Sequence, residues 1–200
     1  MASLPHSPAA ERNKEPILAQ LRAILGERGT ALEIASGTGQ HAVWFAASLA
    51  GWTWQPTDAD PAMLPVIAGQ IAQSGLSNVL PPRQLDVTAP QWPFTQPFDA
   101  IFCANMLHIA PWEACAALMA GAGRHLAPGG MLITYGPYFE QALPPAPSNL
   151  AFDQSLRARD PSWGIRQLEA VATQARRAGL ALAQRHAMPA NNLLLVFVAG

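Results

Sequence analysis

Short apolar runs alternate along this chain with longer segments in which apolar residues recur every three or four positions. The short runs predict buried β-strands, and the wider spacing predicts helices that turn one face toward a sheet. Strands are expected at residues 32–34, 52–56, 79–85, 98–103, 131–135, 180–186 and 193–198. Because predicted helices and short turns separate these strands, the fold class should be α/β, with helices on both faces of a mostly parallel sheet.

The predicted helices and the last turn complete this outline. Helices are expected at residues 16–25, 42–49, 61–71, 111–122 and 165–175. Pro16 suits the first turn of its helix, because proline lacks the N–H that a helix start leaves unpaired. Only a few residues around Pro189 join the last two strands, which is too short for a helical crossover. We therefore predict a Rossmann-like, seven-stranded sheet that ends in an antiparallel C-terminal hairpin.

The composition fits one globular domain. The chain has 200 residues, half of them apolar, so we treat residues 1–200 as one domain with an N-terminal cap and helix at 1–28. Charged residues make up only 12% and the net charge is −1, so no basic field favours nucleic acid. The two cysteines form no CxxC pair, and no apolar run approaches the ~18 residues of a membrane span. We expect a cytoplasmic protein without membrane contact.

The segment from residue 32 to residue 41 carries the clearest chemistry, because an apolar strand leads through a glycine loop into a helix. Gly37 and Gly39 have no Cβ, so the backbone can approach a ligand, and the helix start that follows favours a polar or anionic group. Asp58 lies nineteen residues after Gly39, at the end of the next predicted strand. A carboxylate at this spacing can accept hydrogen bonds from both ribose hydroxyls of a nucleotide cofactor.

The glycine loop alone does not identify the cofactor. Gly37-x-Gly39-x-x-Ala42 also satisfies the loose dinucleotide pattern, so a nicotinamide-dependent oxidoreductase is one alternative. That alternative is weakened because Lys14 is the only lysine, which excludes a Tyr-x-x-x-Lys pair. An ordinary glycine-rich turn between a strand and a helix is the structural alternative.

Several motifs match one family, in order, along almost the whole chain. They are residues 10–18 (AERNKEPIL), the Glu33 loop with Gly39-Gln40-His41, residues 98–109 (FDAIFCANMLHI), Tyr135-Gly136-Pro137 and residues 148–166. The chain thereby resembles an uncharacterised class I methyltransferase-like family, found in bacteria and with a human methyltransferase-like relative. The resemblance implies the class I methyltransferase fold and S-adenosylmethionine as cofactor, but no particular methyl acceptor. This chain departs from the pattern Glu-x-Gly-x-Gly-x-Gly at Ala35, and from a more polar segment at residues 140–147.

The resemblance also implies a cofactor site. Glu33 would orient the methionine end of the cofactor, and Asp58 would bind the ribose. Asp86 would lie near the adenine amino group and Val87 against the ring, with a turn cap as the alternative role of Asp86. The complete predicted cofactor site is Glu33, Ala35, Gly37, Gly39, His41, Asp58, Asp86, Val87, Asn105 and Met106.

Methyl transfer from a sulfonium needs a base only where the acceptor must lose a proton. His108 is the candidate base, since the unperturbed pKa of histidine, about 6.5, lies near neutral pH; capping the following helix is its alternative role. Tyr135 is the second catalytic candidate, and Tyr138 is a candidate contact of the acceptor. Both tyrosines would look the same as aromatic wall residues.

Residues 137–166 are expected to form an insertion that covers the acceptor. The candidate contacts with the acceptor are Asn13, Asn149, Asp153, Arg157 and Trp163. The alternative is an ion-pair network that holds the insertion in place, made by Arg157, Arg159, Asp160 and Arg166. For Arg12 and Asn13, placed before the first predicted helix, the choice is between closing over the cofactor and forming an exposed helix start.

These observations favour a methyltransferase that uses S-adenosylmethionine and acts on a small-molecule acceptor. The alternatives are the oxidoreductase and a cofactor-binding module without catalysis that works through a protein partner; a homo-oligomer is also left open. Nucleic acid is disfavoured as substrate, because residues 104–107 lack the Pro-Pro-aromatic run that amino-directed base methyltransferases use to stack a flipped base. No His, Cys and Asp cluster at ligand spacing points to a metal.

Overall fold

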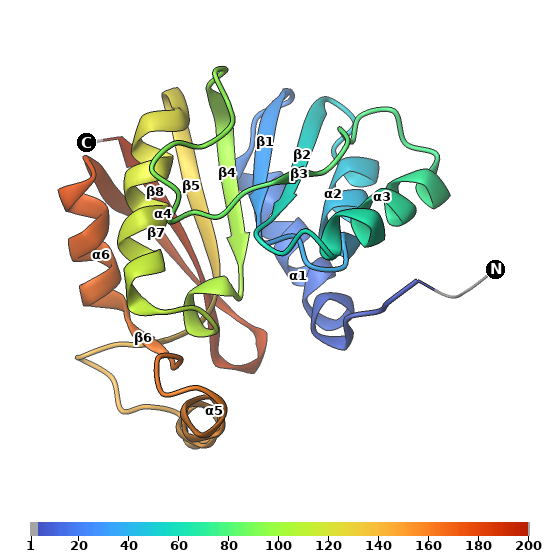
Figure 1. Ribbon diagram of the computed structural model, residues 1–200. Helices are drawn as coiled ribbons and strands as arrows, with labels where there is room; N and C mark the ends of the chain where they lie inside the picture. The colour runs from blue at the N-terminus through green and yellow to red at the C-terminus, as the bar shows by residue number, and fades with distance from the viewer. Residues whose placement is uncertain (1–3, 200) are drawn as a thin grey trace.

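The computed structural model describes residues 4–199 and confirms the predicted α/β class (Figure 1). The strands are β1 (Gly29–Ile34), β2 (Trp52–Asp58), β3 (Arg83–Gln84), β4 (Phe98–Ala104), β5 (Leu126–Phe139), β6 (Arg166–Gln167), β7 (Leu180–Met188) and β8 (Asn192–Ala199). The helices are α1 (Pro8–Ile24), α2 (Gln40–Ser48), α3 (Met63–Ser74), η1 (Met106–His108), α4 (Trp112–His125), α5 (Pro147–Arg159), α6 (Leu168–Arg177) and η2 (Pro189–Asn191). Each of the seven predicted strands has a counterpart, and β6 is an additional two-residue strand.

The sheet has the predicted topology, with strand order β3-β2-β1-β4-β5-β8-β7 and β6 beside β5. β1 runs parallel to β2 and β4, and β4 runs parallel to β5. β8 runs antiparallel to both of its neighbours, with Leu194 opposite Tyr135 of β5 and opposite His186 of β7. The short connection around Pro189 therefore makes the antiparallel hairpin that its length requires.

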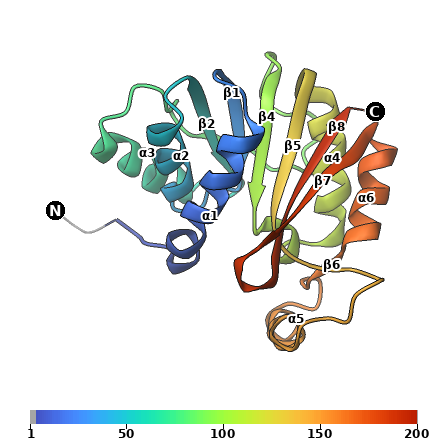
Figure 2. The ribbon, with the colours of Figure 1, turned by 180° about the vertical axis from the view of Figure 1, so that it is seen from behind.

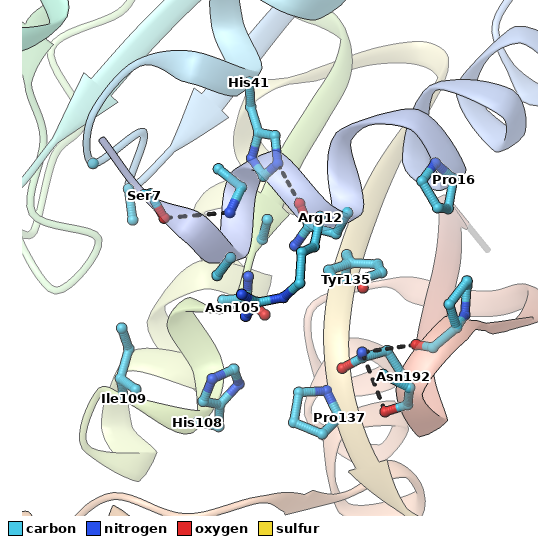
Figure 3. Close-up of a pocket in the computed structure, with 18 of the residues that line it drawn as sticks. Ser7, Arg12, Pro16, His41, Asn105, His108, Ile109, Tyr135, Pro137 and Asn192 are labelled. Carbon is cyan, nitrogen blue, oxygen red and sulfur yellow. Dashed lines mark hydrogen bonds between the residues drawn. The ribbon is translucent and has the colours of Figure 1, made fainter. Parts of the chain in front are cut away.

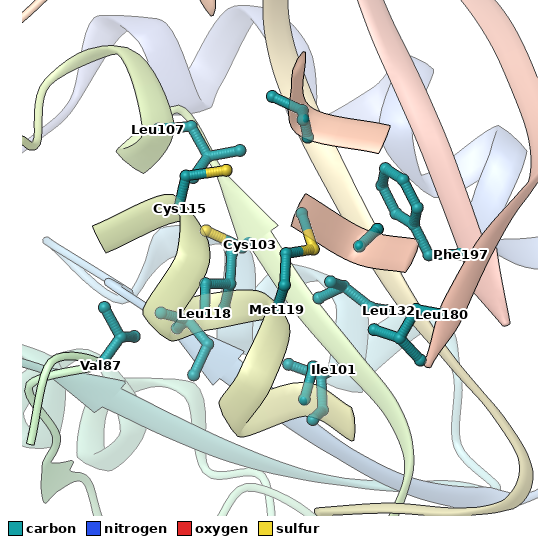
Figure 4. Packing of buried hydrophobic residues seen from close by; sticks show 14 of the residues in the cluster. Val87, Ile101, Cys103, Leu107, Cys115, Leu118, Met119, Leu132, Leu180 and Phe197 are labelled. Carbon is teal, nitrogen blue, oxygen red and sulfur yellow. The ribbon is translucent and has the colours of Figure 1, made fainter. Parts of the chain in front are cut away.

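Two apolar clusters cover the two faces of the sheet, so the central strands are buried on both sides. The cluster under α4 and α6 includes Cys103, Cys115, Leu118 and Phe197, as Figure 4 shows. The cluster on the other face lies under α1 and α2, which Figure 2 shows from behind. Burial raises the pKa of both cysteine thiols to about 12, so both stay protonated and serve as core residues. No helix within residues 4–199 combines the length and the apolar character that a membrane crossing needs.

The first helix begins at Pro8 rather than at Pro16, which corrects the sequence prediction. The Ser7 hydroxyl accepts a hydrogen bond from the Ala10 N–H at 3.3 Å, and Pro8 follows at the first helical position, so the true start has an N-cap. Pro16 lies inside the helix, and the buried Asn13 interrupts the apolar stripe there. As a result, Arg12 and Asn13 belong to α1 itself and do not precede it.

In Figure 1, helix α5 lies past the carboxyl end of β4, which is the end with the arrowhead. It belongs to the segment that joins β5 to β6, within the predicted insertion at residues 137–166. The Asn149 amide of α5 donates to the Asn191 carbonyl at 3.0 Å, and the Asn191 amide donates to the Ser148 hydroxyl at 3.1 Å. These bonds fasten α5 to the turn between β7 and β8, at the carboxyl edge of the parallel strands.

Candidate functional site

A cavity of about 1060 Å³ opens at this carboxyl edge. One wall is the loop after β1, from Ala35 to Thr38, and a second wall is the first half of α1. η1, α5 and the β7–β8 turn close the other sides, and Figure 3 shows the side chains that point into it. Crevices outside the carboxyl ends of parallel strands are the usual ligand sites of such sheets.

The loop has a left-handed backbone at three of its residues. Gly37 and Gly39 have φ values of 55° and 77°, and Ala35 has a φ of 54°. Glycine takes this conformation freely, whereas an alanine is strained there by roughly 1–2 kcal/mol. The position at which this chain departs from the family pattern is thus one where glycine would be unstrained. Ala35 therefore holds a strained backbone conformation in this loop.

Glu33 lies beneath the loop and does not line the cavity. Its carboxylate accepts a hydrogen bond from the Trp54 indole N–H, and the side chain is 2% exposed. Burial raises the pKa of Glu33 to about 8, against smaller lowering effects of Trp54 and Ser36. The carboxyl group is therefore mostly protonated at neutral pH, and it supports the loop from inside the protein.

Asp58 lies at the end of β2, as predicted, and binds the same loop from its far side. One carboxylate oxygen accepts the Gly37 N–H at 2.8 Å, and the other accepts the Asp60 N–H at 3.0 Å. Each oxygen of a carboxylate offers about two acceptor positions, so Asp58 keeps capacity for further hydrogen bonds. Asp58 itself does not line the cavity.

Asp86 and Val87 also lie outside the cavity. The Asp86 carboxylate accepts hydrogen bonds from the N–H and the hydroxyl of Thr88, at 2.8 and 2.7 Å, so it caps its own turn. Val87 is buried in the cluster under α4. The structure thus gives Asp86 the role of turn cap, and a contact with adenine stays a prediction.

His41 and Asn13 join α2 to α1 in the cavity wall. A His41 ring nitrogen lies 2.7 Å from the Asn13 side-chain oxygen, and the His41 ring stacks on Phe45 at 5.1 Å between centroids. Burial lowers the pKa of His41 to about 4, and the charge of Lys14 adds to this. His41 is therefore neutral at physiological pH and holds α1 over the loop.

Asn105 and His108 reach the cavity from the end of β4. Asn105 has a φ of 63° and donates its N–H to the Tyr135 carbonyl at 2.8 Å. This left-handed residue turns the chain into η1, which places His108 in the cavity wall while the neighbouring Met106 packs on the core instead. The His108 ring meets Phe152 of α5 edge to face, at 5.5 Å between centroids.

The imidazole of His108 is unprotonated at neutral pH, although its lowered pKa makes it a weaker base than a free imidazole. Burial, with a smaller contribution from the positive charge of Arg166, lowers the pKa of His108 to about 4. The ring is thus in its neutral form throughout the physiological range. A neutral imidazole has one nitrogen with a free lone pair, which can act as the base.

Arg166 holds the turn that carries His108. Its guanidinium donates to the carbonyls of Leu107, at 2.8 Å, Ala110 and Ser162. The Gly164 N–H also donates to the His108 carbonyl at 3.0 Å. Arg166 therefore binds backbone carbonyls, which corrects the predicted ion-pair network at this residue. A contact between a side chain and distant carbonyls leaves no pattern of its own in a sequence.

Tyr135 lines the cavity, and Tyr138 does not. The two are three residues apart on β5, and side chains of a strand alternate between faces, so an odd separation puts them on opposite sides. The Tyr138 hydroxyl donates to Thr134 at 2.8 Å inside the core. This arrangement removes Tyr138 from the candidate contacts of an acceptor, because no part of its side chain reaches the cavity.

The residues predicted on the insertion divide in the same way. Asn149 lines the cavity, whereas Asp153, Arg157 and Trp163 do not. The Asp153 carboxylate accepts from Arg157 at 2.8 Å and from the Ile165 N–H at 2.7 Å, and the Arg159 guanidinium lies 4.9 Å from the centre of the Trp163 ring. These contacts hold α5 and the segment after it in place, so the role is structural, but they are not the predicted network: Arg157 pairs with Asp153, and Arg159 packs on Trp163.

Many residues of the cavity wall lie outside the predicted cofactor and acceptor sites, and three of them matter most here: Ile109, Phe152 and Arg12, for which closing over the cofactor was one of two expected roles. Arg12 extends from α1 into the cavity toward Asn105 in Figure 3. In the sequence, Arg12 was noticed only as the neighbour of Asn13. Because the first helix was predicted to begin at Pro16, the direction of the Arg12 side chain could not be inferred. Phe152 was visible only as one of two apolar residues four apart in α5, the other being Leu156.

Comparisons with known proteins agree with this architecture. A structure of an O-methyltransferase family 2 protein from Planctomyces limnophilus in complex with apigenin has a TM-score of 0.78, 18% identity, and coverage of 94% of this chain and 59% of that one. The mitomycin 7-O-methyltransferase MmcR has a TM-score of 0.83, 14% identity, and coverage of 96% and 54%. Human N-acetylserotonin methyltransferase in complex with SAM has a TM-score of 0.79, 14% identity, and coverage of 96% and 53%.

The chain thus spans little more than half the length of each of these proteins, and at such identities the likeness shows the fold. A family model described as protein of unknown function, DUF938, matches residues 4–199. The match covers nearly the whole chain. The protein therefore belongs to the DUF938 family, whose members have unknown function, and it has the α/β fold of these methyltransferases.

Proposed function

We propose that this protein is an S-adenosylmethionine-dependent methyltransferase that acts on a small-molecule acceptor. The observation that carries the proposal is that one cavity joins the left-handed loop at Gly37 to the side chains of His108 and Tyr135. A cofactor at the loop and an acceptor at His108 would share this space. Its volume of about 1060 Å³ lies at the upper end of the ~300–1,000 Å³ typical of small-molecule sites.

The residues at the loop fit this cofactor. Gly37 leaves the backbone open to close approach, whereas Gly39 packs against Ile67, and no side chain caps the N-terminus of α2. Asp58 retains acceptor positions for ribose hydroxyls beyond its bonds to the loop. The human neighbour was solved with SAM, and the neighbours CalO1 and PigF were solved with SAH, which supports the same cofactor here.

When bound, S-adenosylmethionine supplies an electrophilic methyl group whose sulfur leaves as a thioether. The acceptor atom must then approach that methyl group in line, and the walls formed by α1 and α5 would hold it there and exclude water. His108 would take the proton of an acceptor hydroxyl or amine on its imidazole nitrogen. The Tyr135 hydroxyl would donate a hydrogen bond to the acceptor. Burial raises the pKa of Tyr135, so this hydroxyl keeps its proton.

The proposal is tested by calorimetric titration with S-adenosylmethionine, S-adenosylhomocysteine and the nicotinamide dinucleotides. We expect micromolar binding of the first two and none of the dinucleotides. Dinucleotide binding would instead favour an oxidoreductase. Binding of the first two without turnover of any acceptor would favour a cofactor-binding module that works through a protein partner.

The variant Asp58→Ala tests the cofactor site in the same titration. We expect it to weaken binding of S-adenosylhomocysteine by about 1–3 kcal/mol, because ribose hydroxyls would lose a charged acceptor and Gly37 its partner. Asp99→Ala is the matched control, since the Asp99 carboxylate accepts the N–H and the hydroxyl of Thr30 at the amino end of β1, away from the cavity. Equal losses in the two variants would argue against a special role of Asp58.

A further inference from the structure

The charge on the cavity wall is unbalanced. Among the described residues that line it, Arg12 is the one Arg or Lys, and none is Asp or Glu. None of the ion pairs found within residues 4–199 includes Arg12. Its guanidinium points into the cavity, toward Asn105 in Figure 3. A cation that faces a cavity without a carboxylate partner is free to bind an anionic group of a ligand.

The acidic residues nearest to the loop do not offset this charge. Asp58 is on the far side of the loop, where its oxygens accept the N–H groups of Gly37 and Asp60. Glu33 lies under the loop with its pKa raised by burial, so it is mostly uncharged at neutral pH. The two histidines of the wall, His41 and His108, are neutral as well. The cavity therefore carries one net positive charge from the protein.

The proposed cofactor would add to this positive charge. S-adenosylmethionine carries a sulfonium, an ammonium and a carboxylate, and is thus a net cation at neutral pH. Its own carboxylate has a place at the uncapped N-terminus of α2, where backbone N–H groups favour an anion. The acceptor must approach the methyl group of the sulfonium, so the sulfonium and Arg12 would be the charges nearest to it, while Asp58 would lie at the ribose; this disfavours a cation and favours an anion.

The mouth of the same cavity is apolar. Ile109 and Phe152 both line it, and they are 43% and 40% exposed although both are large apolar side chains. Ile109 directly follows η1, and Phe152 belongs to α5. The His108 ring packs against the Phe152 ring. An apolar, and in particular an aromatic, body would bury these two side chains when it binds.

We propose that the methyl acceptor is a small molecule with an apolar body and a carboxylate, and that Arg12 binds this carboxylate. The guanidinium of Arg12 binds the carboxylate through charge-assisted hydrogen bonds, while Ile109 and Phe152 contact the apolar body. Arg12 is thus a specificity residue for the acceptor. This inference rests on the methyltransferase function proposed above and adds the chemical class of the acceptor to it.

The test compares carboxylates with their uncharged amides on protein saturated with sinefungin, whose amine reproduces the positive charge of the cofactor. The probes are benzoate, 4-hydroxybenzoate, cinnamate, indole-3-acetate and octanoate, each titrated beside its primary amide. We expect at least one carboxylate to bind about tenfold or more tightly than its amide, since a charge-assisted hydrogen bond contributes that much. In Arg12→Gln this preference should disappear. The control Arg22→Gln, on an exposed position near the far end of α1, should retain it.

Three outcomes contradict the proposals, and they are distinguishable. If no carboxylate binds more tightly than its amide while sinefungin binds, the acceptor class is wrong and the cofactor assignment stands. If Arg12→Gln lowers the affinity for sinefungin itself, the anion at Arg12 is the carboxylate of the cofactor, and the acceptor assignment is wrong. If sinefungin does not bind to the wild-type protein, the proposed function fails first. Circular dichroism of each variant shows whether it is folded.

Discussion

The backbone conformation of single residues decides the shape of the loop after β1. Ala35 adopts a φ of 54°, a conformation in which its Cβ crowds the neighbouring carbonyl oxygen. Three other non-glycine residues at this edge are left-handed: Asn105 and Asn191, with φ values of 63° and 56° that asparagine tolerates better, and Ala190, with a φ of 56°. The strain at this edge is therefore concentrated at the two alanines, Ala35 in the loop after β1 and Ala190 in the β7–β8 turn.

Replacing Ala35 by glycine should stabilise the protein. Relief of roughly 1–2 kcal/mol of strain exceeds the 0.4–1 kcal/mol that glycine adds in chain entropy, so we expect a net gain of about 0.5–1 kcal/mol in the free energy of unfolding. Urea denaturation measures it. Ala72→Gly is the matched control, because Ala72 is exposed within α3, where glycine is a poorer helix former than alanine and stability should be lost. A loss in both variants would contradict the strain at Ala35.

The imidazole of His108 should stay unprotonated well below neutral pH. Burial and the nearby charge of Arg166 place the pKa of His108 at about 4 rather than 6.5. The ring signals of His108 in an NMR titration, assigned by their absence in His108→Asn, should therefore not move between pH 8 and about pH 5.5. Movement centred near pH 6.5 would contradict the lowered pKa and would mean that the ring is open to water.

At the scale of elements, the position of η1 depends on a contact from β6. Arg166 donates to the carbonyls of Leu107 and Ala110, which lie on either side of His108, and to that of Ser162. This contact connects the end of β4 with the segment after α5. Its geometry, more than any contact inside η1, determines where the His108 ring lies.

The variant Arg166→Met should lose about 2–4 kcal/mol of stability, since it leaves carbonyls without their charged donor. It should also reduce methyl transfer with any acceptor more than it reduces cofactor affinity, because η1 lies away from the loop. Denaturation and calorimetry measure the two effects. Arg159→Met is the control, since Arg159 is exposed and packs only on Trp163. Equal effects of the two substitutions would show that η1 does not need Arg166.

The elements that the sequence predicted well are those whose signal is local. The strand at residues 98–103 is apolar except at the exposed Asp99, because both faces of the strand are covered beyond that residue, and β4 spans Phe98–Ala104. The hairpin around Pro189 followed from the length of its connection. The start of α1 was wrong because Asn13 is a buried polar residue whose partner, His41, is distant in the sequence.

The candidate site shows the same division between local and distant information. The glycine loop after β1 and the place of Asp58 at the end of β2 depend on short-range pattern, and the structure has both; of these residues Gly37 lines the cavity, whereas Gly39 and Asp58 do not. The separation of Tyr135 from Tyr138 was available from strand periodicity, since three residues change the face. Which polar side chains of the insertion face the cavity depended on how α5 docks, and no spacing within the insertion determines that.

At the scale of the whole molecule, three buried titratable groups make stability depend on pH. The pKa of Glu33 rises from 4.5 to about 8 in the folded protein, while those of His41 and His108 fall from 6.5 to about 4. Burial is the main cause in each case, because it disfavours the charged form of both acids and bases. Glu33 therefore binds its proton more tightly in the folded state, and the two histidines bind theirs less tightly.

These shifts have opposite signs and overlapping ranges. The contribution of Glu33 is fully present below pH 4.5 and is lost as the pH rises toward 8, whereas that of the histidines is present above pH 6.5 and is lost as the pH falls toward 4. Between pH 4.5 and 6.5 two histidines oppose one glutamate, so stability falls toward acid. Between pH 6.5 and 8 Glu33 acts alone, so stability falls toward base. The unliganded protein should therefore be most stable near pH 6.5.

The variant Glu33→Gln isolates the basic side of this profile. Its amide oxygen can still accept the Trp54 N–H, but it has no proton to lose, so stability should no longer fall between pH 6.5 and 8. In the wild-type protein the fall should approach about 1.4 kcal/mol per pH unit in this range. Urea denaturation at half-unit intervals from pH 5 to pH 9 measures both curves. Subtracting the free energy of unfolding of the variant from that of the wild type cancels the contributions of all other titrating groups. If this difference in free energy stays constant with pH, Glu33 is ionised beneath the loop.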